Sequence, residues 1–162
     1  MSQSNILNVE DDSNDALLLQ QACRKAAVNS KLVSVNDGDE AIAYLEGEHE
    51  FGNRTRFPLP DLMLLDLKLP RLSGFQVLVW LRENEKWRHL PVIVLSSSIH
   101  DADVRRAYAL GANSYLVKPV AFESLVQIVK MIHQYWLTLN VQSEHLRPRG
   151  TQDQFSQPQR PA

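Results

Sequence analysis

Residues 61–70 read Asp-Leu-Met-Leu-Leu-Asp-Leu-Lys-Leu-Pro, and this stretch predicts the central strand of the fold. Four consecutive apolar residues, Leu62 to Leu65, lie between two aspartates. A run this short without alternation is typical of a strand buried on both faces, as in parallel sheets. Asp66 then stands at the carboxyl end of the strand, the edge at which open α/β sheets bind ligands. An ionised carboxylate is costly there unless it is hydrated, paired or metal-bound. We therefore expect other residues of the chain to supply a counter-charge or metal ligands beside Asp66.

The unit of a short apolar strand followed by a helical pattern occurs five times along the chain. Strands are also predicted over 5–9, 31–35, 92–95 and 113–117, and the last helix over 122–139. Ser13 and Asn14 are candidate caps of the first helix and Asp101 of the fourth. Residues 47–60 have no apolar periodicity and are interpreted as a long surface loop. Strands that alternate with helices favour a parallel sheet with right-handed crossovers and helices on both faces.

Composition limits the classes of protein to consider. The chain has 162 residues, 44% of them hydrophobic, and a net charge of -2, which does not favour nucleic-acid or anionic-membrane binding. Its single cysteine, Cys23, excludes an internal disulfide. We see no signal peptide and no apolar run near the roughly 20 residues of a membrane span, so we expect a cytoplasmic protein. After Asn140 the composition becomes rich in Pro, Gln and Ser, which predicts one domain over 1–140 and a disordered tail over 141–162.

Polar residues occur where the predicted strands end. Glu10 and Asp11 follow the first strand, Asp66 the third, Ser96 the fourth and Lys118 the fifth. The carboxyl ends of parallel strands lie along one edge, so these side chains can converge. Neighbouring carboxylates raise one another's pKa unless a cation neutralises them, and Mg²⁺ prefers oxygen ligands of this kind. Carboxylate, metal, ammonium and hydroxyl are the parts of a phosphoryl-transfer site, with Asp66 as nucleophile. Ser97 and Ser98 are interpreted as a polar turn.

Five motifs in order resemble the receiver domain of two-component response regulators, over about residues 5–139. They are the acidic pair Glu10-Asp11, Leu-Leu-Asp66-Leu-x-Leu-Pro70 with Gly74, Ser96 after Pro-Val-Ile-Val-Leu, Tyr115, and Lys118-Pro119. The resemblance implies a flavodoxin-like (βα)5 fold, a doubly wound parallel sheet with strand order 2-1-3-4-5.

The resemblance also implies a phosphoacceptor and a metal site. Asp66 resembles the aspartate that takes a phosphoryl group from a histidine kinase, forming a 4-aspartylphosphate. Asp11 resembles the direct Mg²⁺ ligand and Glu10 a ligand acting largely through water. The backbone carbonyl of Lys68 would complete the site.

The remaining positions carry over as phosphate-binding and switch residues. Lys118 resembles the lysine that contacts the phosphoryl oxygens. Ser96 resembles the switch hydroxyl, and Tyr115 the aromatic that turns inward when that hydroxyl moves. The Lys118–Pro119 bond is cis in domains of this family, and X–Pro bonds are where cis costs least.

The loop at 47–60 and the ending Lys-Met-Ile-His-Gln-Tyr-Trp136 resemble the small single-domain regulators of phytochrome-type histidine kinases, which are typically homodimers. We therefore expect output through protein contacts, by the face of the fourth helix, fifth strand and fifth helix. Trp136, Tyr135, Leu137 and Leu139 leave the last helix apolar on more than one side, which favours a partner or dimer surface.

Two other functions remain open at this stage. An aspartyl-nucleophile phosphatase of the haloacid-dehalogenase type also uses Asp, Mg²⁺ and Lys, but has a second Asp two residues after the first. Lys68 stands at that position, which argues against an enzyme with steady turnover, although self-dephosphorylation is compatible with it. A receiver-like adaptor that is never phosphorylated is the other alternative, and the intact acidic set argues against it.

Overall fold

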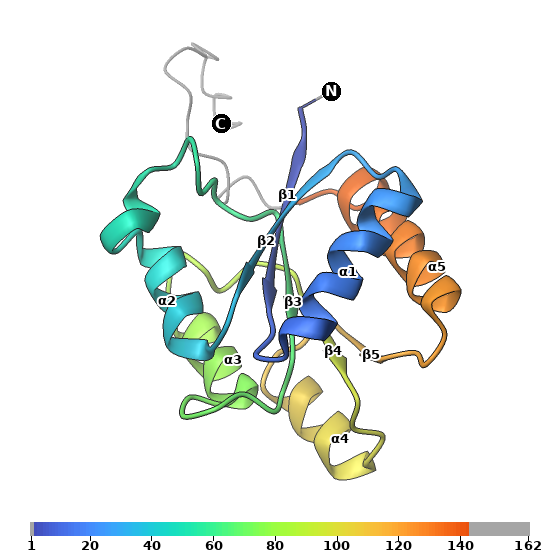
Figure 1. The fold of residues 1–162 in the computed structure, drawn as a ribbon. Helices are drawn as coiled ribbons and strands as arrows, with labels where there is room; N and C mark the ends of the chain where they lie inside the picture. Colours follow the sequence, from blue (N-terminus) through green and yellow to red (C-terminus); the bar gives the residue numbers. More distant parts are fainter. Residues whose placement is uncertain (1, 143–162) are drawn as a thin grey trace, which may run out of the picture.

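The computed structural model describes residues 2–142. Five strands form one sheet in the order β2-β1-β3-β4-β5, and every neighbouring pair is parallel (Figure 1). The strands are β1 Ser4–Val9, β2 Ser30–Val35, β3 Leu62–Leu65, β4 Val92–Ser96 and β5 Ser114–Val117. This order confirms the flavodoxin-like fold expected from the sequence, with β3 at the centre.

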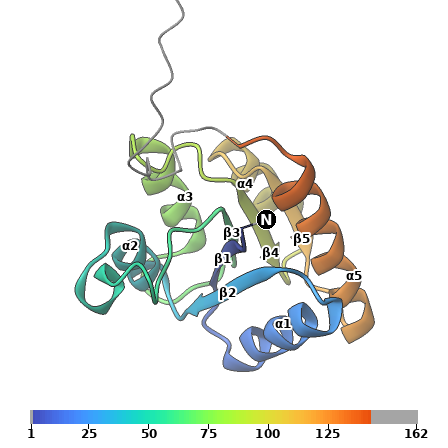
Figure 2. The same ribbon diagram turned by 90° about the horizontal axis from the view of Figure 1, so that it is seen from above.

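The helices cover both faces of the sheet. They are α1 Ser13–Ala26, α2 Gly38–Glu46, α3 Gly74–Glu83, α4 Asp101–Ala109 and α5 Phe122–Ile132. The helices α1 and α5 pack side by side on one face, and α2 and α3 lie on the other (Figures 1 and 2). Ala107 brings α4 into the same cluster as α2 and α3. In the described chain, no helix is both long and apolar enough to cross a bilayer.

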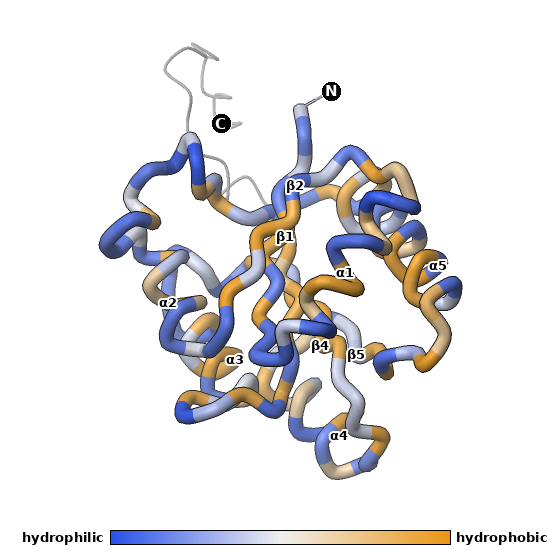
Figure 3. Tube along the Cα trace, viewed as in Figure 1, coloured by the Kyte–Doolittle hydropathy of each residue, from blue (hydrophilic) through white to orange (hydrophobic). Residues whose placement is uncertain are grey.

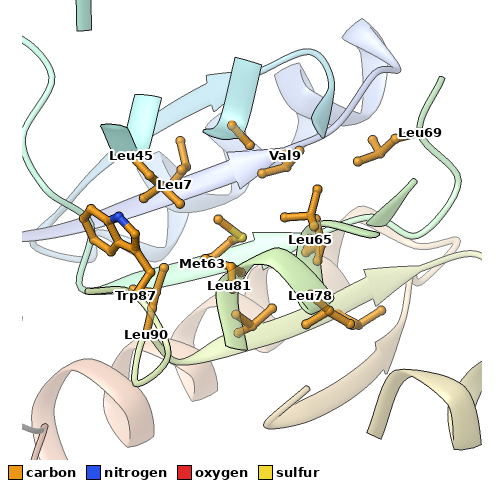
Figure 4. Packing of buried hydrophobic residues seen from close by; sticks show 14 of the residues in the cluster. Leu7, Val9, Leu45, Met63, Leu65, Leu69, Leu78, Leu81, Trp87 and Leu90 are labelled. Atoms are coloured by element: carbon orange, nitrogen blue, oxygen red, sulfur yellow. The ribbon is translucent and has the colours of Figure 1, made fainter. Parts of the chain in front are cut away.

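Strand β3 divides its side chains between two cores, which explains the unbroken apolar run. Met63 and Leu65 join the cluster under α2 and α3, whereas Leu62 and Leu64 join the cluster under α1 and α5. All four are buried, and Figure 4 shows Met63 and Leu65 packed among side chains of α2 and α3. Since burying a Leu or Met side chain contributes about 2 kcal/mol, this strand is a large part of the core. Figure 3 shows the hydrophobic centre and the hydrophilic 47–60 loop.

Two predicted helix caps are wrong. Helix α1 is capped by Asp12, whose carboxylate accepts hydrogen bonds from the backbone N–H groups of Asn14 at 2.8 Å and Asp15 at 3.1 Å. Ser13 and Asn14 are therefore the first two residues of the helix and lie after the cap. Asp101 lies within α4, where His100 precedes the helix without a side-chain cap. A carboxylate interacts favourably with the helix dipole both at the N-cap and in the first turn. The sequence position alone therefore does not distinguish a capping acid from a first-turn acid.

The 47–60 segment is held to the domain by aromatic packing. It contains a 3-10 helix, His49–Gly52, and Phe51 within it is buried. The rings of Tyr44, Phe51 and Phe57 contact one another at centroid distances of 5.1–6.0 Å. Arg54 donates to the carbonyls of Tyr44 and Leu45, which end α2. The segment is therefore more than a surface loop, because its irregular backbone still buries aromatic side chains.

The last helix changes its winding. An α-helix reaches Ile132, and a π-helix follows over His133–Leu139, where one helix was predicted over 122–139. A π-helix has more residues per turn, which alters which side chains face the sheet. Trp136 and Leu137 both pack against the cluster between α1 and α5, whereas Tyr135 and Leu139 are 55% and 64% exposed. Most of the tail predicted to be disordered, 143–162, lies outside the described residues.

Candidate functional site

Three acids meet where β1 and β3 end, at the lower edge of the sheet in Figure 1. Glu10 and Asp11 follow β1, and the backbone N–H of Asp66 donates to the carbonyl of Val9 at 3.1 Å. One carboxylate oxygen from each of Glu10, Asp11 and Asp66 lies within 4.8 Å of the others. Glu10 and Asp66 are buried, and Asp11 is exposed. A cluster of oxygen donors open on one side fits a hard divalent cation such as Mg²⁺.

Lys118 lies against these acids from the end of β5. Its Nζ is 2.5 Å from Glu10 Oε2 and 3.0 Å from Asp66 Oδ2. It is also 2.9 Å from Oδ2 of Asp15, in the first turn of α1. The Lys118 backbone N–H donates to the carbonyl of Ser96 at 2.8 Å, and this hydrogen bond fixes the backbone position of Lys118. Of the five residues predicted to converge, Glu10, Asp11, Asp66 and Lys118 meet here, and Asp15 joins them.

Burial and charge shift the protonation equilibria of this cluster. Burial raises the pKa of Glu10 to about 7, Lys118 opposes the shift by its hydrogen bond, and the charge of Asp66 adds to it. For Lys118, burial alone would lower the pKa, but the hydrogen bonds to Asp15, Glu10 and Asp66 outweigh it and raise the pKa. The ammonium therefore stays charged across the physiological range, whereas Glu10 titrates near neutrality.

The loop after β3 holds the Asp66 backbone closely. A Cβ at Gly74 would lie 2.2 Å from the Asp66 carbonyl oxygen, so only glycine lets α3 begin there. The N–H of Gly74 donates to the carbonyl of Leu67 at 3.0 Å. The backbone N–H of Lys68 donates to Asp66 Oδ1 at 3.3 Å, while its side chain points to solvent. Hence α3 directly supports the loop that carries Asp66.

The two predicted switch residues converge on the loop after β4. Ser96 is fully buried, and its Oγ accepts a hydrogen bond from the N–H of Ser98 at 3.2 Å. The Tyr115 hydroxyl donates to the carbonyl of Ser98 at 2.9 Å. Ser98, predicted to be a plain turn residue, is itself buried, and its hydroxyl donates to Asp103 of α4. One loop therefore joins Ser96, Tyr115 and α4.

The peptide bond before Pro119 differs from the expectation. No peptide bond in residues 2–142 is cis, so Lys118–Pro119 is trans, whereas the resemblance implied a cis bond. Trans is the lower-energy isomer of X–Pro bonds by about 0.5–1 kcal/mol.

Sequence reasoning missed Asp15 and the Ser98–Asp103 contact. Asp15 is 103 residues from Lys118, and an acid in a helix's first turn is ordinarily explained by the helix dipole. The spacing Glu10-Asp11-x-x-x-Asp15 was the available signal, since the first turn of α1 begins directly beside the strand end.

Comparison with known proteins agrees with this architecture. The sequence pattern of the family described as response regulator receiver domain matches residues 6–130. "Probable methanogenesis regulatory protein FilR2" of Methanothrix harundinacea (strain 6Ac) is 42% identical over 135 residues, which are 83% of this chain and 84% of that protein. Response regulator Rcp1 of Synechocystis sp. (strain ATCC 27184 / PCC 6803 / Kazusa) is 36% identical over 132 residues, 82% of this chain and 88% of Rcp1.

Solved structures extend the likeness to three dimensions. The phosphorylated cyanobacterial phytochrome response regulator RcpA is 39% identical, with a TM-score of 0.78 over 87% of this chain and 99% of RcpA. The Mn²⁺-bound form of Rcp1 is 34% identical, with a TM-score of 0.76 over 86% of this chain and 99% of Rcp1. Both relatives match along almost their whole length.

Proposed function

The chain belongs to the response regulator receiver family, and on that premise we propose that it accepts a phosphoryl group from a histidine kinase on Asp66. The observation that carries the proposal is the position of Lys118 Nζ, within 3.0 Å of both Glu10 and Asp66. A buried carboxylate beside a permanently charged ammonium can receive a phosphoryl group whose new charge is neutralised at once. Relatives add support, since RcpA has been solved in phosphorylated form.

In the proposed reaction, a carboxylate oxygen of Asp66 attacks the phosphorus of a phosphohistidine. A P–O bond forms as the P–N bond breaks, and the imidazole leaves. In the structure Lys118 donates to Oδ2 of Asp66 and the Lys68 N–H to Oδ1, and each oxygen keeps a further lone pair that can bond to phosphorus. Lys118 then donates to a phosphoryl oxygen. Receiver domains of this kind act as signalling proteins, so we propose no catalytic turnover on an external substrate.

The metal that fits this site is Mg²⁺. Asp11, Glu10 and Asp66 would hold it, with the Lys68 carbonyl as a further oxygen. When bound, the ion supplies positive charge to phosphoryl oxygens. The Mn²⁺-bound form of Rcp1 supports a divalent cation in this family.

Output would pass through the loop after β4. A phosphoryl group on Asp66 draws Ser96 and Lys118 toward it, and the loop that bonds Tyr115 and Asp103 moves with Ser96. Such a local change biases a two-state element, here α4 with β5. We place the partner surface on the α4–β5–α5 face, where Tyr108, Val117 and Val120 are exposed.

We further propose that the donor is a phytochrome-type kinase in the cytoplasm and that the chain forms a homodimer through the same face. The phytochrome link is supported by RcpA and by the bacteriophytochrome response regulators RtBRR and AtBRR, whereas FilR2 has a name from methanogenesis. Light scattering tests the dimer: wild type should give twice the monomer mass, and Val117→Glu the monomer mass. A monomeric wild type at working concentrations contradicts it. Trp136 is unsuitable as the variant because it is partly buried and packs against the core cluster between α1 and α5.

Intact mass after incubation with Mg²⁺ and acetyl phosphate tests the phosphoacceptor. Wild type should gain one phosphoryl group, and Asp66→Asn should gain none. Asp61→Asn is the matched control, because Asp61 begins the same stretch at its other end and its carboxylate accepts a hydrogen bond from the Asn5 N–H. Prior EDTA should abolish the gain. If neither acetyl phosphate nor beryllofluoride modifies the wild type, the chain is a phosphorylation-independent adaptor.

A further inference from the structure

Lys118 has three carboxylate partners, and one of them stands outside the candidate metal group. Glu10 and Asp66 contribute oxygens to the cluster that fits a divalent cation. Asp15 contributes none, yet its Oδ2 is 2.9 Å from Lys118 Nζ, closer than the 3.0 Å of Asp66. Asp15 is thus tied to the site only through the lysine.

An ammonium has three N–H donors, and these three carboxylates use all of them. A phosphoryl oxygen can be bound only if one partner is released. Glu10 and Asp66 are the partners that a divalent cation also claims, and the positive charge of that cation repels the ammonium. Asp15 is the partner that remains available when the other two are occupied.

The position of Asp15 is fixed by the fold. It lies in the first turn of α1, below the Asp12 cap, whose carboxylate accepts from the Asp15 N–H. Leu19 and Ala22 bury the next turns of α1 in the cluster shared with α5. Asp15 and Lys118 line a small, partly open pocket of about 50 Å³, together with Leu18, Leu125 and Pro119.

The ion pair is suited to positioning more than to stability. The Asp15 side chain is 42% exposed, and partly exposed ion pairs contribute little to folding because water screens them. The Lys118 side chain is 17% exposed, and its ammonium lies among the three carboxylates. The ion pair therefore contributes little to the stability of the domain, but it restricts the position of the ammonium.

We propose that Asp15 is a positioning residue for Lys118: it keeps the ammonium beside Asp66 while the metal ion and the phosphoryl group occupy the other two carboxylates. This inference rests on the proposed phosphoacceptor function. With Asp15 removed, Lys118 shares its charge with Glu10 and Asp66 alone, so it competes harder with the metal and is held less well once the metal has bound.

The test measures Asp15→Asn in two backgrounds, wild type and Lys118→Met. Beside wild-type Lys118, the substitution should slow phosphorylation by acetyl phosphate about 3- to 10-fold and weaken Mg²⁺ binding about 3-fold in calorimetry. In the Lys118→Met background the same substitution should change either quantity less than about 2-fold. Asp15→Glu, which keeps the carboxylate, should recover most of the rate.

Asp101→Asn is the matched control, since Asp101 is also a first-turn acid, on α4, and should leave both quantities unchanged. Equal losses in both Lys118 backgrounds would overturn the proposal, because Asp15 would then act through helix stability or general charge. No loss in either background would overturn it as well. The Mg²⁺ titration keeps the two proposals apart: it reports on Asp15 even if no variant, wild type included, accepts a phosphoryl group.

Discussion

Two half-buried cations lie at opposite ends of the sheet, and they are neutralised in opposite ways. Lys118, at the carboxyl ends of the strands, donates to three carboxylates. Arg82, near the end of α3 and the amino ends of β4 and β5, donates to the carbonyls of Gly111, Arg88 and Leu90 and to the side-chain oxygen of Asn113.

The consequence appears in their protonation. Burial lowers the pKa of Arg82, because its acceptors are neutral, whereas the acids raise the pKa of Lys118 in spite of burial. A carboxylate can bind a metal or be converted to an acyl phosphate, whereas a neutral backbone carbonyl cannot accept a phosphoryl group. On the proposed function, the cation held by carboxylates serves the phosphoryl transfer, whereas the cation held by carbonyls joins segments of the chain.

Replacing Lys118 should have the largest effect on function. In Lys118→Met the phosphoryl charge loses its ammonium, so we expect phosphorylation of Asp66 by acetyl phosphate to slow about 100-fold. Intact-mass time courses with wild type and Lys118→Arg in parallel would measure this. A rate within a few-fold of wild type would show that Lys118 has no part in the transfer.

Replacing Arg82 should cost stability and leave function intact. Arg82→Ala leaves several carbonyls without a donor, and we expect a loss of about 2–3 kcal/mol in the free energy of unfolding by urea. Arg82→Lys should lose nearly as much, since a lysine cannot span the same acceptors. The phosphorylation rate of either variant should match wild type under folding conditions. Slower phosphorylation of fully folded Arg82→Lys would contradict the distinction between a functional Lys118 and a structural Arg82.

The pH dependence of metal binding should identify Glu10. Its folded-state pKa is raised to about 7, so a proton must leave before the carboxylate can face a cation. Mg²⁺ affinity should therefore fall as pH falls, by about 10-fold between pH 8 and pH 6, and level off above neutrality. Calorimetry in non-chelating buffers would measure it. Glu10→Gln should bind more weakly and without this pH dependence.

The same group gives the opposite sign for folding without metal. The folded protein holds a proton on Glu10 that the unfolded chain releases near its ordinary pKa of 4.5. Stability from this group should fall as pH rises from about 4.5 to 7, and saturating Mg²⁺ should reduce that fall.

The smallest effect is expected at Asn113. Its Oδ1 accepts from Arg82 and from the backbone N–H of Val92 at the start of β4. Asn113→Ala removes both hydrogen bonds and should lower the free energy of unfolding by about 1 kcal/mol. In the Arg82→Ala background the loss should be smaller, because one partner is already gone. Additive losses would mean that the two residues act separately.

The sequence predicts this molecule best where one physical requirement decides. The strand at Leu62–Leu65 follows from burial on both faces. The turn between Pro70 and Gly74 follows from backbone geometry, so the central strand and its end could be predicted. The convergence of Asp66, Lys118 and the acidic pair follows from the parallel topology.

Prediction fails where several residues compete for one role. Asp12, Ser13 and Asn14 are all good caps, and only tertiary geometry selects Asp12. Phe51 is buried by an irregular segment with no periodic pattern to show it. The Asp15–Lys118 pair joins residues 103 positions apart, and an acid in the first turn of a helix is ordinarily explained by the helix dipole.

From the sequence span of the Lys118 contacts, we also expect an order for the events of folding. Lys118 meets Glu10 across 108 positions, and β5 is the last strand in the chain and an edge of the sheet. Contacts of such sequence separation close late, because the loop entropy must first be overcome. A nascent chain that has formed β1 to β4 therefore has its acids in place without their ammonium. Competence for phosphorylation should appear only when β5 docks, so an immature chain would not respond to the signal.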